Sequence, residues 1–210
     1  MADSIISDTC LFYIHDPMCS WCFALSSNLS ALQNDLPSNI RMIFLLGGLA
    51  PDTTEPMPTD LQKAIQQTWR QIERTVPTTR FNYDFWTENT PLRSTYPACR
   101  AILAARKQGA KFESQMLQAI QLAYYQQAKN PSLAITLQQC AAEIGLDENA
   151  FINDLTSPAI ESELRSEIQL ARNMEVTSYP SLRLLHKQKL IAIPIDYLNH
   201  QTMIDLVNSY

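Results

Sequence analysis

One stretch of the sequence decides the fold, and it reads Leu11-Phe12-Tyr13-Ile14-His15-Asp16-Pro17-Met18-Cys19-Ser20-Trp21-Cys22. Its first four residues are apolar and β-prone, which predicts a strand, and Pro17 ends that strand because proline has no backbone donor. Leucines then recur at steps of four, three and four residues, at positions 25, 29, 32 and 36, which predicts one face of a helix. The cysteine pair therefore stands where a strand gives way to a helix.

The flanking residues extend this unit into a mixed α/β domain. Residues 40–46 are apolar and branched, and breakers stand on both sides of them, so residues 11–48 read strand, helix, strand with parallel pairing and a right-handed crossover. In the last part of the chain we expect a helix from Ser157-Pro158, a turn over 176–180, strands over 181–185 and 189–193, and a helix over 199–207. The order of elements is βαβ…αββα.

The segment between these two parts has the pattern of helices alone. Apolar stripes predict helices at residues 61–72, 99–106, 112–124, 133–144 and around Phe151, with Thr95, Ser132 and Asp147 as N-caps. The aromatic run over 81–86 has no period, which predicts a loop. We therefore assign residues 1–50 and 158–210 to one α/β domain and residues 51–157 to an all-helical insertion domain.

Composition narrows the classes of function. The 210 residues carry a formal net charge of −5 without a basic stripe, which argues against nucleic acid as a partner. No apolar run approaches the roughly 18 residues that span a bilayer, so no membrane partner is expected. Met1–Asp8 has acids in place of a basic leader, which predicts a cytoplasmic protein. Five scattered cysteines do not form the pattern of a disulfide framework.

The spacing of Cys19 and Cys22 predicts disulfide exchange. The attacking group must be a thiolate, which a free cysteine with a pKa of about 8.5 supplies poorly at neutral pH. At the start of the expected helix, unpaired N–H groups and the helix dipole stabilise a thiolate on Cys19, whereas Cys22 lies one turn in and is more shielded. We predict that Cys19 attacks and Cys22 resolves. The alternatives are two inert thiols or half of a zinc site, and because no second ligand pair has the usual spacing, no metal is predicted.

Pro180 is the second part of the signal. It stands in Tyr179-Pro180, between an expected helix and an expected strand. A cis bond here turns the backbone sharply and leaves the polar groups of Tyr179 free to pair with an extended substrate. The alternative is an ordinary trans proline at a strand start. With the cysteine pair in place, we predict the cis isomer.

These stretches together resemble the DsbA-like branch of the thioredoxin superfamily, in which a thioredoxin fold carries a helical insertion. The similarity is greatest to a group of predicted cytosolic protein-disulfide isomerases, and the matching stretches are residues 13–22, Gly47-Gly48-Leu49, 81–86, 93–101 and Tyr179-Pro180. The resemblance implies exchange with disulfide-containing proteins or small thiols. It implies no cofactor besides the redox-active disulfide, with glutathione an open candidate as co-substrate.

Two positions depart from that family. Its members often bury a carboxylate six residues before the first cysteine, where this chain has Tyr13, so proton transfer has to use Asp16, His15 or water. Ser20-Trp21 stands between the cysteines in place of the better-known dipeptides, and this dipeptide does not indicate the reduction potential of the pair. The cytoplasm keeps thiols reduced, which favours a disulfide reductase or isomerase over a net oxidant.

Several residues and functions stay open at this point. His15 either assists proton transfer or is a hydrogen-bonded residue at a strand end, and Trp21 either offers substrate a platform or covers the helix start. Cys99 is expected to be a core residue more than a third redox thiol, and Cys140 to be core. The alternative functions are a glutathione-dependent transferase or isomerase of the kappa type, which usually has serine in place of Cys19, and a redox-inert binding module.

Overall fold

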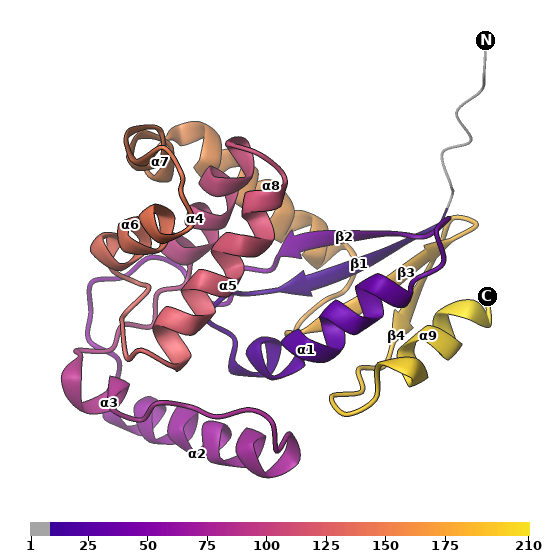
Figure 1. Ribbon diagram of the computed structural model, residues 1–210, viewed down its shortest axis with the longest axis horizontal. Helices are drawn as coiled ribbons and strands as arrows, with labels where there is room; N and C mark the ends of the chain where they lie inside the picture. The colour runs from indigo at the N-terminus through magenta and orange to yellow at the C-terminus, as the bar shows by residue number, and fades with distance from the viewer. Residues whose placement is uncertain (1–8) are drawn as a thin grey trace.

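A four-stranded sheet lies at the centre of the computed structural model, which describes residues 9–210 (Figure 1). Its strands are β1 (Cys10–His15), β2 (Arg41–Leu46), β3 (Ser181–His186) and β4 (Lys189–Ile193), in the order β2-β1-β3-β4. β1 pairs with β2 in parallel, and the pairs β1–β3 and β3–β4 are antiparallel. The mixed sheet predicted from the two ends of the chain is therefore confirmed.

Helices cover both faces of this sheet because the side chains of β1 alternate between them. Leu11 and Tyr13 pack with the leucine face of α1 (Ser20–Asp35) and with α9 (His200–Asn208), which lie on one face. The other face packs against α8 (Pro158–Asn173). This arrangement brings the first turn of α1 to the end of β1.

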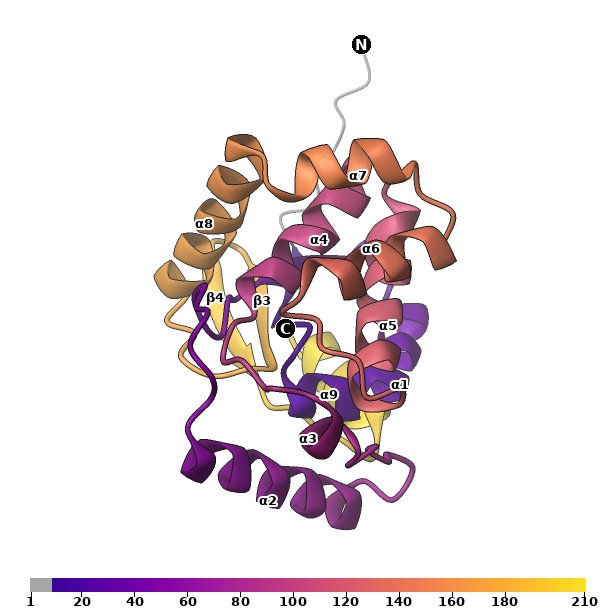
Figure 2. The same ribbon diagram turned by 90° about the vertical axis from the view of Figure 1, so that its left-hand side faces the viewer.

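The remaining helices form a block beside the sheet (Figure 2). In chain order they are α2 (Thr59–Thr75), α3 (Phe85–Glu88), α4 (Tyr96–Lys107), α5 (Lys111–Tyr125), α6 (Ala134–Glu143) and α7 (Glu148–Leu155). α4 is buried along most of its length, and the core of the block continues into the sheet unit through Met18, Ala24 and Leu46. The expected α/β fold with a helical insertion is therefore confirmed.

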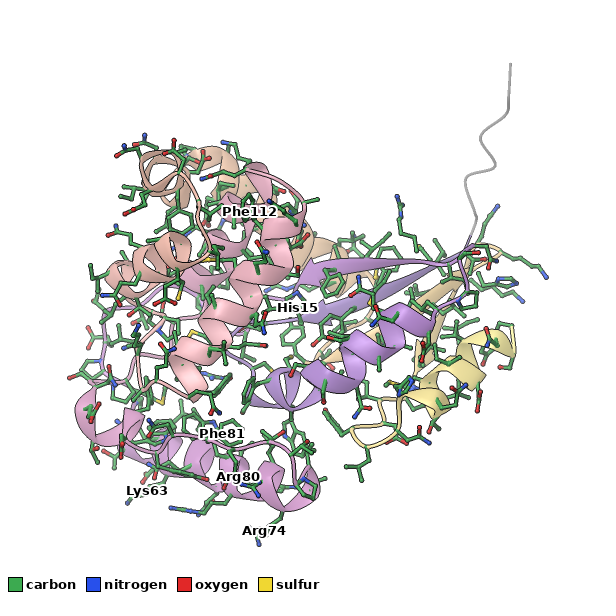
Figure 3. The ribbon with its side chains drawn as sticks, in the orientation of Figure 1. His15, Lys63, Arg74, Arg80, Phe81 and Phe112 are labelled. Carbon is green, nitrogen blue, oxygen red and sulfur yellow. The ribbon has the colours of Figure 1, made fainter. Side chains whose placement is uncertain are left out.

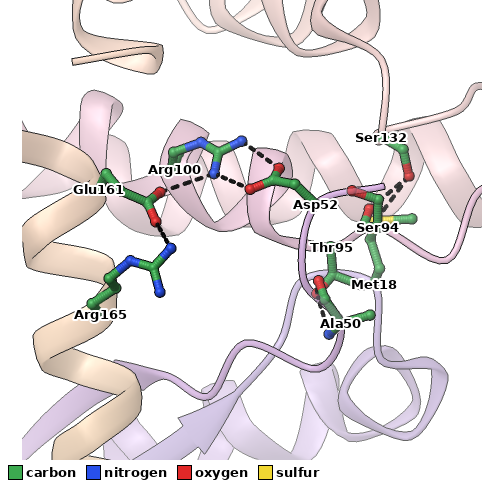
Figure 4. A network of polar contacts seen from close by, with 9 residues as sticks. All are labelled: Met18, Ala50, Asp52, Ser94, Thr95, Arg100, Ser132, Glu161 and Arg165. Carbon is green, nitrogen blue, oxygen red and sulfur yellow. Dashed lines mark hydrogen bonds and ion pairs between the residues drawn. The ribbon is translucent and has the colours of Figure 1, made fainter. Parts of the chain in front are cut away.

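Thr95 stands at the N-cap position of α4, as predicted, but its side chain makes no capping hydrogen bond, and the cap predicted at Ser132 is wrong. The Thr95 hydroxyl does not cap α4, because it donates at 2.6 Å to the carboxylate of Asp16, a stronger acceptor than a backbone group. The Ser132 hydroxyl donates at 2.6 Å to the carbonyl of Ser94, as Figure 4 shows, and Leu133 takes the N-cap position of α6. Both hydroxyls are drawn to acceptors that are distant in sequence.

The aromatic run over 81–86 is a loop only in its first part. A short helix begins at Phe85, whose buried ring packs beside Trp69 of α2. Trp69 also stacks on Phe81 with ring centroids 4.7 Å apart, so these rings form part of the core of the insertion. The predicted cap at Asp147 is confirmed, since its side chain accepts from the N–H of Ala150.

The domain boundaries at residues 51 and 158 stay a prediction. The expectation drawn from Met1–Asp8, and the beginning of the 1–50 span, lie outside the described residues. No helix within residues 9–210 has both the length and the apolar character needed to cross a membrane.

Candidate functional site

Cys19 occupies the N-cap position of α1. Its backbone is extended, and its sulfur accepts a hydrogen bond from the N–H of Cys22 with an Sγ···N distance of 3.3 Å. The N–H of Cys19 donates to the carbonyl of Asp16 at 3.1 Å, so the turn after β1 closes directly in front of the helix. A sulfur at this place faces the unpaired donors and the positive end of the helix dipole, an environment that stabilises a thiolate.

Cys22 has a different environment although it lies only one turn further along α1. Its exposed fraction is 1%, against 7% for Cys19. Burial, and after it the neighbouring Cys19 sulfur, raise the pKa of Cys22 well above its ordinary value. Cys22 is therefore held as a neutral thiol in the state described, in which none of the five cysteines forms a disulfide. The pair is asymmetric, as two separate roles in exchange require.

The peptide bond between Tyr179 and Pro180 is cis, the isomer that the sequence predicts. It lies against the cysteine pair, because the thiol of Cys19 donates to the carbonyl of Tyr179 at 3.4 Å. The Tyr179 hydroxyl donates at 2.7 Å to the carbonyl of Gly47 after β2. Glycine is needed there, since a Cβ on Gly47 would lie 2.1 Å from the Tyr179 ring.

Asp16 is a buried carboxylate that fastens the cysteine turn to the rest of the molecule. It accepts from the N–H groups of Met18 at 2.8 Å and Leu49 at 2.7 Å, from the Thr95 hydroxyl and from the Cys99 thiol at 3.6 Å. Burial raises its pKa, and these hydrogen bonds act in the opposite direction. Asp16 thus joins the turn, the loop after β2 and the start of α4.

His15 is buried in the core. In Figure 3 it lies at the end of β1 beside the helical block. Its ring stacks on Tyr13 with centroids 4.9 Å apart and meets Phe44 edge-on, and its Nδ1 has no partner among the described residues. Burial, with a smaller effect from Arg106, lowers the pKa of His15 to about 3. A histidine neutral at physiological pH in this place is not the cationic neighbour that would stabilise a thiolate.

The other predicted residues lie at the rim of the site or beneath it. Trp21 is half-buried and packs on Tyr197 with centroids 4.8 Å apart, and Ser20 is the half-buried first residue of α1. Cys99 is fully buried, as expected, but it contacts Asp16. Burial, and after it the nearby carboxylate, raise the pKa of the Cys99 thiol well above its usual range.

Tyr13 is the residue whose importance the sequence did not reveal. It is buried, and burial first, followed by the neighbouring sulfurs of Cys22 and Cys19, raises its pKa well above the usual value. The departure from a carboxylate at this position was the available signal, because a polar tip on an inward-facing strand residue needs a partner. Tyr197 carried no comparable signal, since it reaches Trp21 from the far end of the chain.

No cluster of three or more potential ligand residues for a metal ion occurs in the described part of the chain. The reactive groups of the site are two sulfurs with different environments, beside the cis peptide bond between Tyr179 and Pro180. This arrangement can form and exchange a disulfide.

Comparisons with known proteins agree with this geometry. The family model described as Thioredoxin matches residues 12–192. A putative protein disulfide isomerase from Nitrosomonas europaea is 20% identical with a TM-score of 0.83, and the alignment covers 96% of each chain. The cytosolic disulfide reductase DsbM from Pseudomonas aeruginosa is 21% identical with a TM-score of 0.73 over 95% of each chain.

The curated relatives are named as adapter proteins, not as disulfide oxidoreductases. The ClpXP adapter protein SpxH of Halalkalibacterium halodurans is 27% identical over 172 residues, which are 79% of this chain and 55% of that protein. The SpxH of Bacillus subtilis is 24% identical over 191 residues, which are 89% of this chain and 62% of that protein. The chain thus spans little more than half the length of these relatives. Because the family model covers most of the chain and the fold matches these solved structures, the chain belongs to the thioredoxin family, with the fold of its DsbA-like branch.

Proposed function

We propose that the protein is a thiol–disulfide oxidoreductase that reduces or isomerises disulfides, with Cys19 as nucleophile and Cys22 as resolving thiol. One observation carries this proposal. Cys19 caps the N-terminus of α1 and is 7% exposed, whereas Cys22, one turn behind it, is 1% exposed and has a raised pKa. Cys19 is the sulfur that faces the cis segment at Tyr179, and Cys22 lies behind it.

The proposed reaction proceeds in two steps, attack by Cys19 and resolution by Cys22. The Cys19 thiolate attacks one sulfur of a substrate disulfide, so a mixed disulfide forms and the other substrate sulfur leaves as a thiolate. Cys22 then loses its proton and attacks the Cys19 sulfur. The Cys19–Cys22 disulfide forms, the bond from Cys19 to substrate breaks, and the substrate is released reduced. A cellular thiol must afterwards reduce the pair.

Substrates of this site are disulfide-containing proteins or small thiols. The cis segment at Tyr179 faces Cys19 and can pair with an extended backbone, while the Trp21–Tyr197 pair offers an apolar surface at the rim. The similar protein DsbM from Pseudomonas aeruginosa has a solved structure with GSH. Glutathione is therefore a candidate co-substrate here, and we propose no other cofactor.

The reducing direction follows from the compartment that we propose, the cytoplasm. DsbM is named a cytosolic disulfide reductase, and cytoplasmic thiol pools keep an accessible pair reduced. A reduced pair attacks disulfides but cannot donate one.

Turnover of a fluorogenic peptide disulfide with excess glutathione tests the proposal. We expect Cys19→Ser to abolish turnover, and Cys22→Ser to attack the substrate and remain in the mixed disulfide. Cys140→Ser is the matched control, because Cys140 is buried in α6 away from the site, and it should retain wild-type turnover. Full activity of Cys19→Ser would refute the assignment.

A second candidate is an adapter that binds a protein partner, favoured by the curated relatives named ClpXP adapter. The Cys22→Ser variant, expressed in its native cell, separates the candidates when its captured partners are identified by mass spectrometry. Protein partners bound through Cys19 support the oxidoreductase. A partner that also binds the Cys19→Ser/Cys22→Ser double variant supports the adapter, and glutathione alone supports a kappa-type transferase.

A further inference from the structure

A cleft between α1 and α5 leads from the surface to the resolving cysteine. Its volume is about 550 Å³, and its lining includes Tyr13 and Cys22 but neither Cys19 nor Tyr179. Hydroxyl and amide side chains form much of its wall, and no charged side chain lines it. Cys22 therefore has a second approach that does not pass the substrate-facing sulfur.

Tyr13 lines this cleft, and two neighbouring rings hold it in place. Its ring lies between the ring of His15, stacked at 4.9 Å, and the ring of Phe44, which meets it edge-on at 5.5 Å. Its exposed fraction is 1%, and it lines the same cleft as Cys22. Burial first, and then the sulfurs of the cysteine pair, raise the pKa of Tyr13 well above its usual value. The phenol therefore keeps its proton and can donate a hydrogen bond to a thiolate on Cys22.

The two side chains that the sequence offered for proton transfer are poorly suited to it. The Asp16 carboxylate already accepts four hydrogen bonds, from Met18, Leu49, Thr95 and Cys99. His15 has a pKa of about 3 and would not hold a proton near neutral pH. Tyr13, by contrast, lines the same cleft as Cys22, and this cleft opens to bulk water.

We propose that Tyr13 is a catalytic residue of the resolving step and that the α1–α5 cleft is its path to solvent. The inference rests on the proposed function. The Tyr13 oxygen takes the proton of the Cys22 thiol while its own hydroxyl proton passes to solvent through the cleft, so Tyr13 ends unchanged. It then donates a hydrogen bond to the Cys22 thiolate, which attacks Cys19 with the bond changes given above.

Other titratable groups near Tyr13 and Cys22 do not obscure this step. They come from each element packed around the pair: His15 and Asp16 at the end of β1, Cys19 of α1, Tyr125 of α5 and Tyr197 before α9. His15 is neutral at every pH well above 3, and burial raises the pKa values of both tyrosines, so they keep their protons. The resolving rate near and above neutral pH therefore follows the proton of Cys22.

An aromatic disulfide that releases a coloured thiolate separates the two steps. Attack by Cys19 releases the first thiolate, and resolution by Cys22 releases the second. Tyr13→Phe keeps the ring and removes the hydroxyl, so we expect an unchanged first phase and a second phase slower by about ten-fold or more. The second phase should also rise at a higher pH than in the wild type, because the Cys22 thiolate loses a hydrogen-bond donor.

Tyr125→Phe is the matched control. Tyr125 is equally buried beside the pair, but its hydroxyl has no partner among the described residues, so both phases should match the wild type. A second arm closes the cleft with Gln118→Trp at its exposed rim on α5, compared with Gln67→Trp on the exposed face of α2. We expect only the Gln118 variant to slow the second phase.

The outcomes distinguish this inference from the function it rests on. Absence of the first phase in the wild-type protein would overturn the proposed function. A normal first phase with a second phase unaffected by Tyr13→Phe would overturn the role of Tyr13. Equal slowing of both phases, or slowing without a change in the pH profile, would assign Tyr13 to structure alone and would also overturn it.

Discussion

Replacing Asp16 with alanine tests how the cysteine turn is held. The carboxylate accepts from the buried N–H groups of Met18 and Leu49, and its removal leaves both donors unpaired at about 1–3 kcal/mol each. The Thr95 hydroxyl loses less, because it retains the carbonyl of Ala50 at 3.3 Å. Burial of the charge, which raises the pKa of Asp16, offsets part of the loss. We expect Asp16→Ala to lower the free energy of unfolding by about 2–4 kcal/mol.

Urea unfolding at neutral pH measures this loss, with Asp84→Ala as the control. Asp84 is exposed and its side chain does not cap α3, so its replacement should change the free energy of unfolding by no more than about 0.5 kcal/mol. A loss for Asp16→Ala equal to that of the control would refute the account of this turn. A slower Cys19 attack in the folded Asp16→Ala protein is also expected, because the N-cap is no longer fixed.

The pH dependence of the same measurement has a definite sign. The pKa of Asp16 is higher in the folded than in the unfolded chain, because the buried charge is poorly solvated. Between the ordinary carboxyl pKa and the raised one, the folded chain therefore binds more protons. The stability of the wild type relative to Asp16→Asn should fall as pH rises through this window. A relative stability that rises there would contradict the burial of this carboxyl.

Three further predictions concern the neighbours of the turn. Gly47→Ala should displace the Tyr179 ring, because the added Cβ would lie 2.1 Å from it. Steady-state kinetics should show turnover slower by about ten-fold, with a raised KM as the main change and little change in the free energy of unfolding. The pKa of His15 is about 3 in the folded chain and about 6.5 in the unfolded chain, so the unfolded chain binds more protons between these values. The free energy of unfolding, relative to that of His15→Asn, should therefore rise with pH across this window by at most about 4–5 kcal/mol. A difference between the two proteins that does not change with pH in urea unfolding would contradict the burial of His15. Iodoacetamide at pH 6 should label Cys19 well before Cys22, as peptide mapping will report, and equal rates would remove the asymmetry on which the mechanism depends.

The sequence predicted the sheet and the position of the cysteine pair because both depend on local patterns. The strand before Pro17 and the leucine steps after Cys22 are short-range signals, and they place the start of α1 at the cysteine pair. The cis isomer of the Tyr179–Pro180 bond could also be predicted, because Pro180 stands between a helix and a strand in a chain that has the cysteine pair.

Contacts between distant segments could not be predicted in the same way. Thr95 and Ser132 are residue types that often cap helices. No local pattern indicates that the Thr95 hydroxyl donates to Asp16 or that the Ser132 hydroxyl donates to Ser94. The cleft beside Tyr13 depends on how far α5 stands from α1, which is set by packing of the whole helical block. Local propensity therefore located the reactive sulfurs but not the groups that hold and relay protons around them.

The central claim is that Cys19 attacks and Cys22 resolves, and the mixed disulfide tests it most directly. Cys22→Ser protein is mixed with one equivalent of a peptide disulfide, quenched with acid and mapped by mass spectrometry. The account predicts a single adduct, on Cys19, that persists until a thiol is added. Adducts spread over the four remaining cysteines, or an adduct confined to Cys10, Cys99 or Cys140, would contradict it.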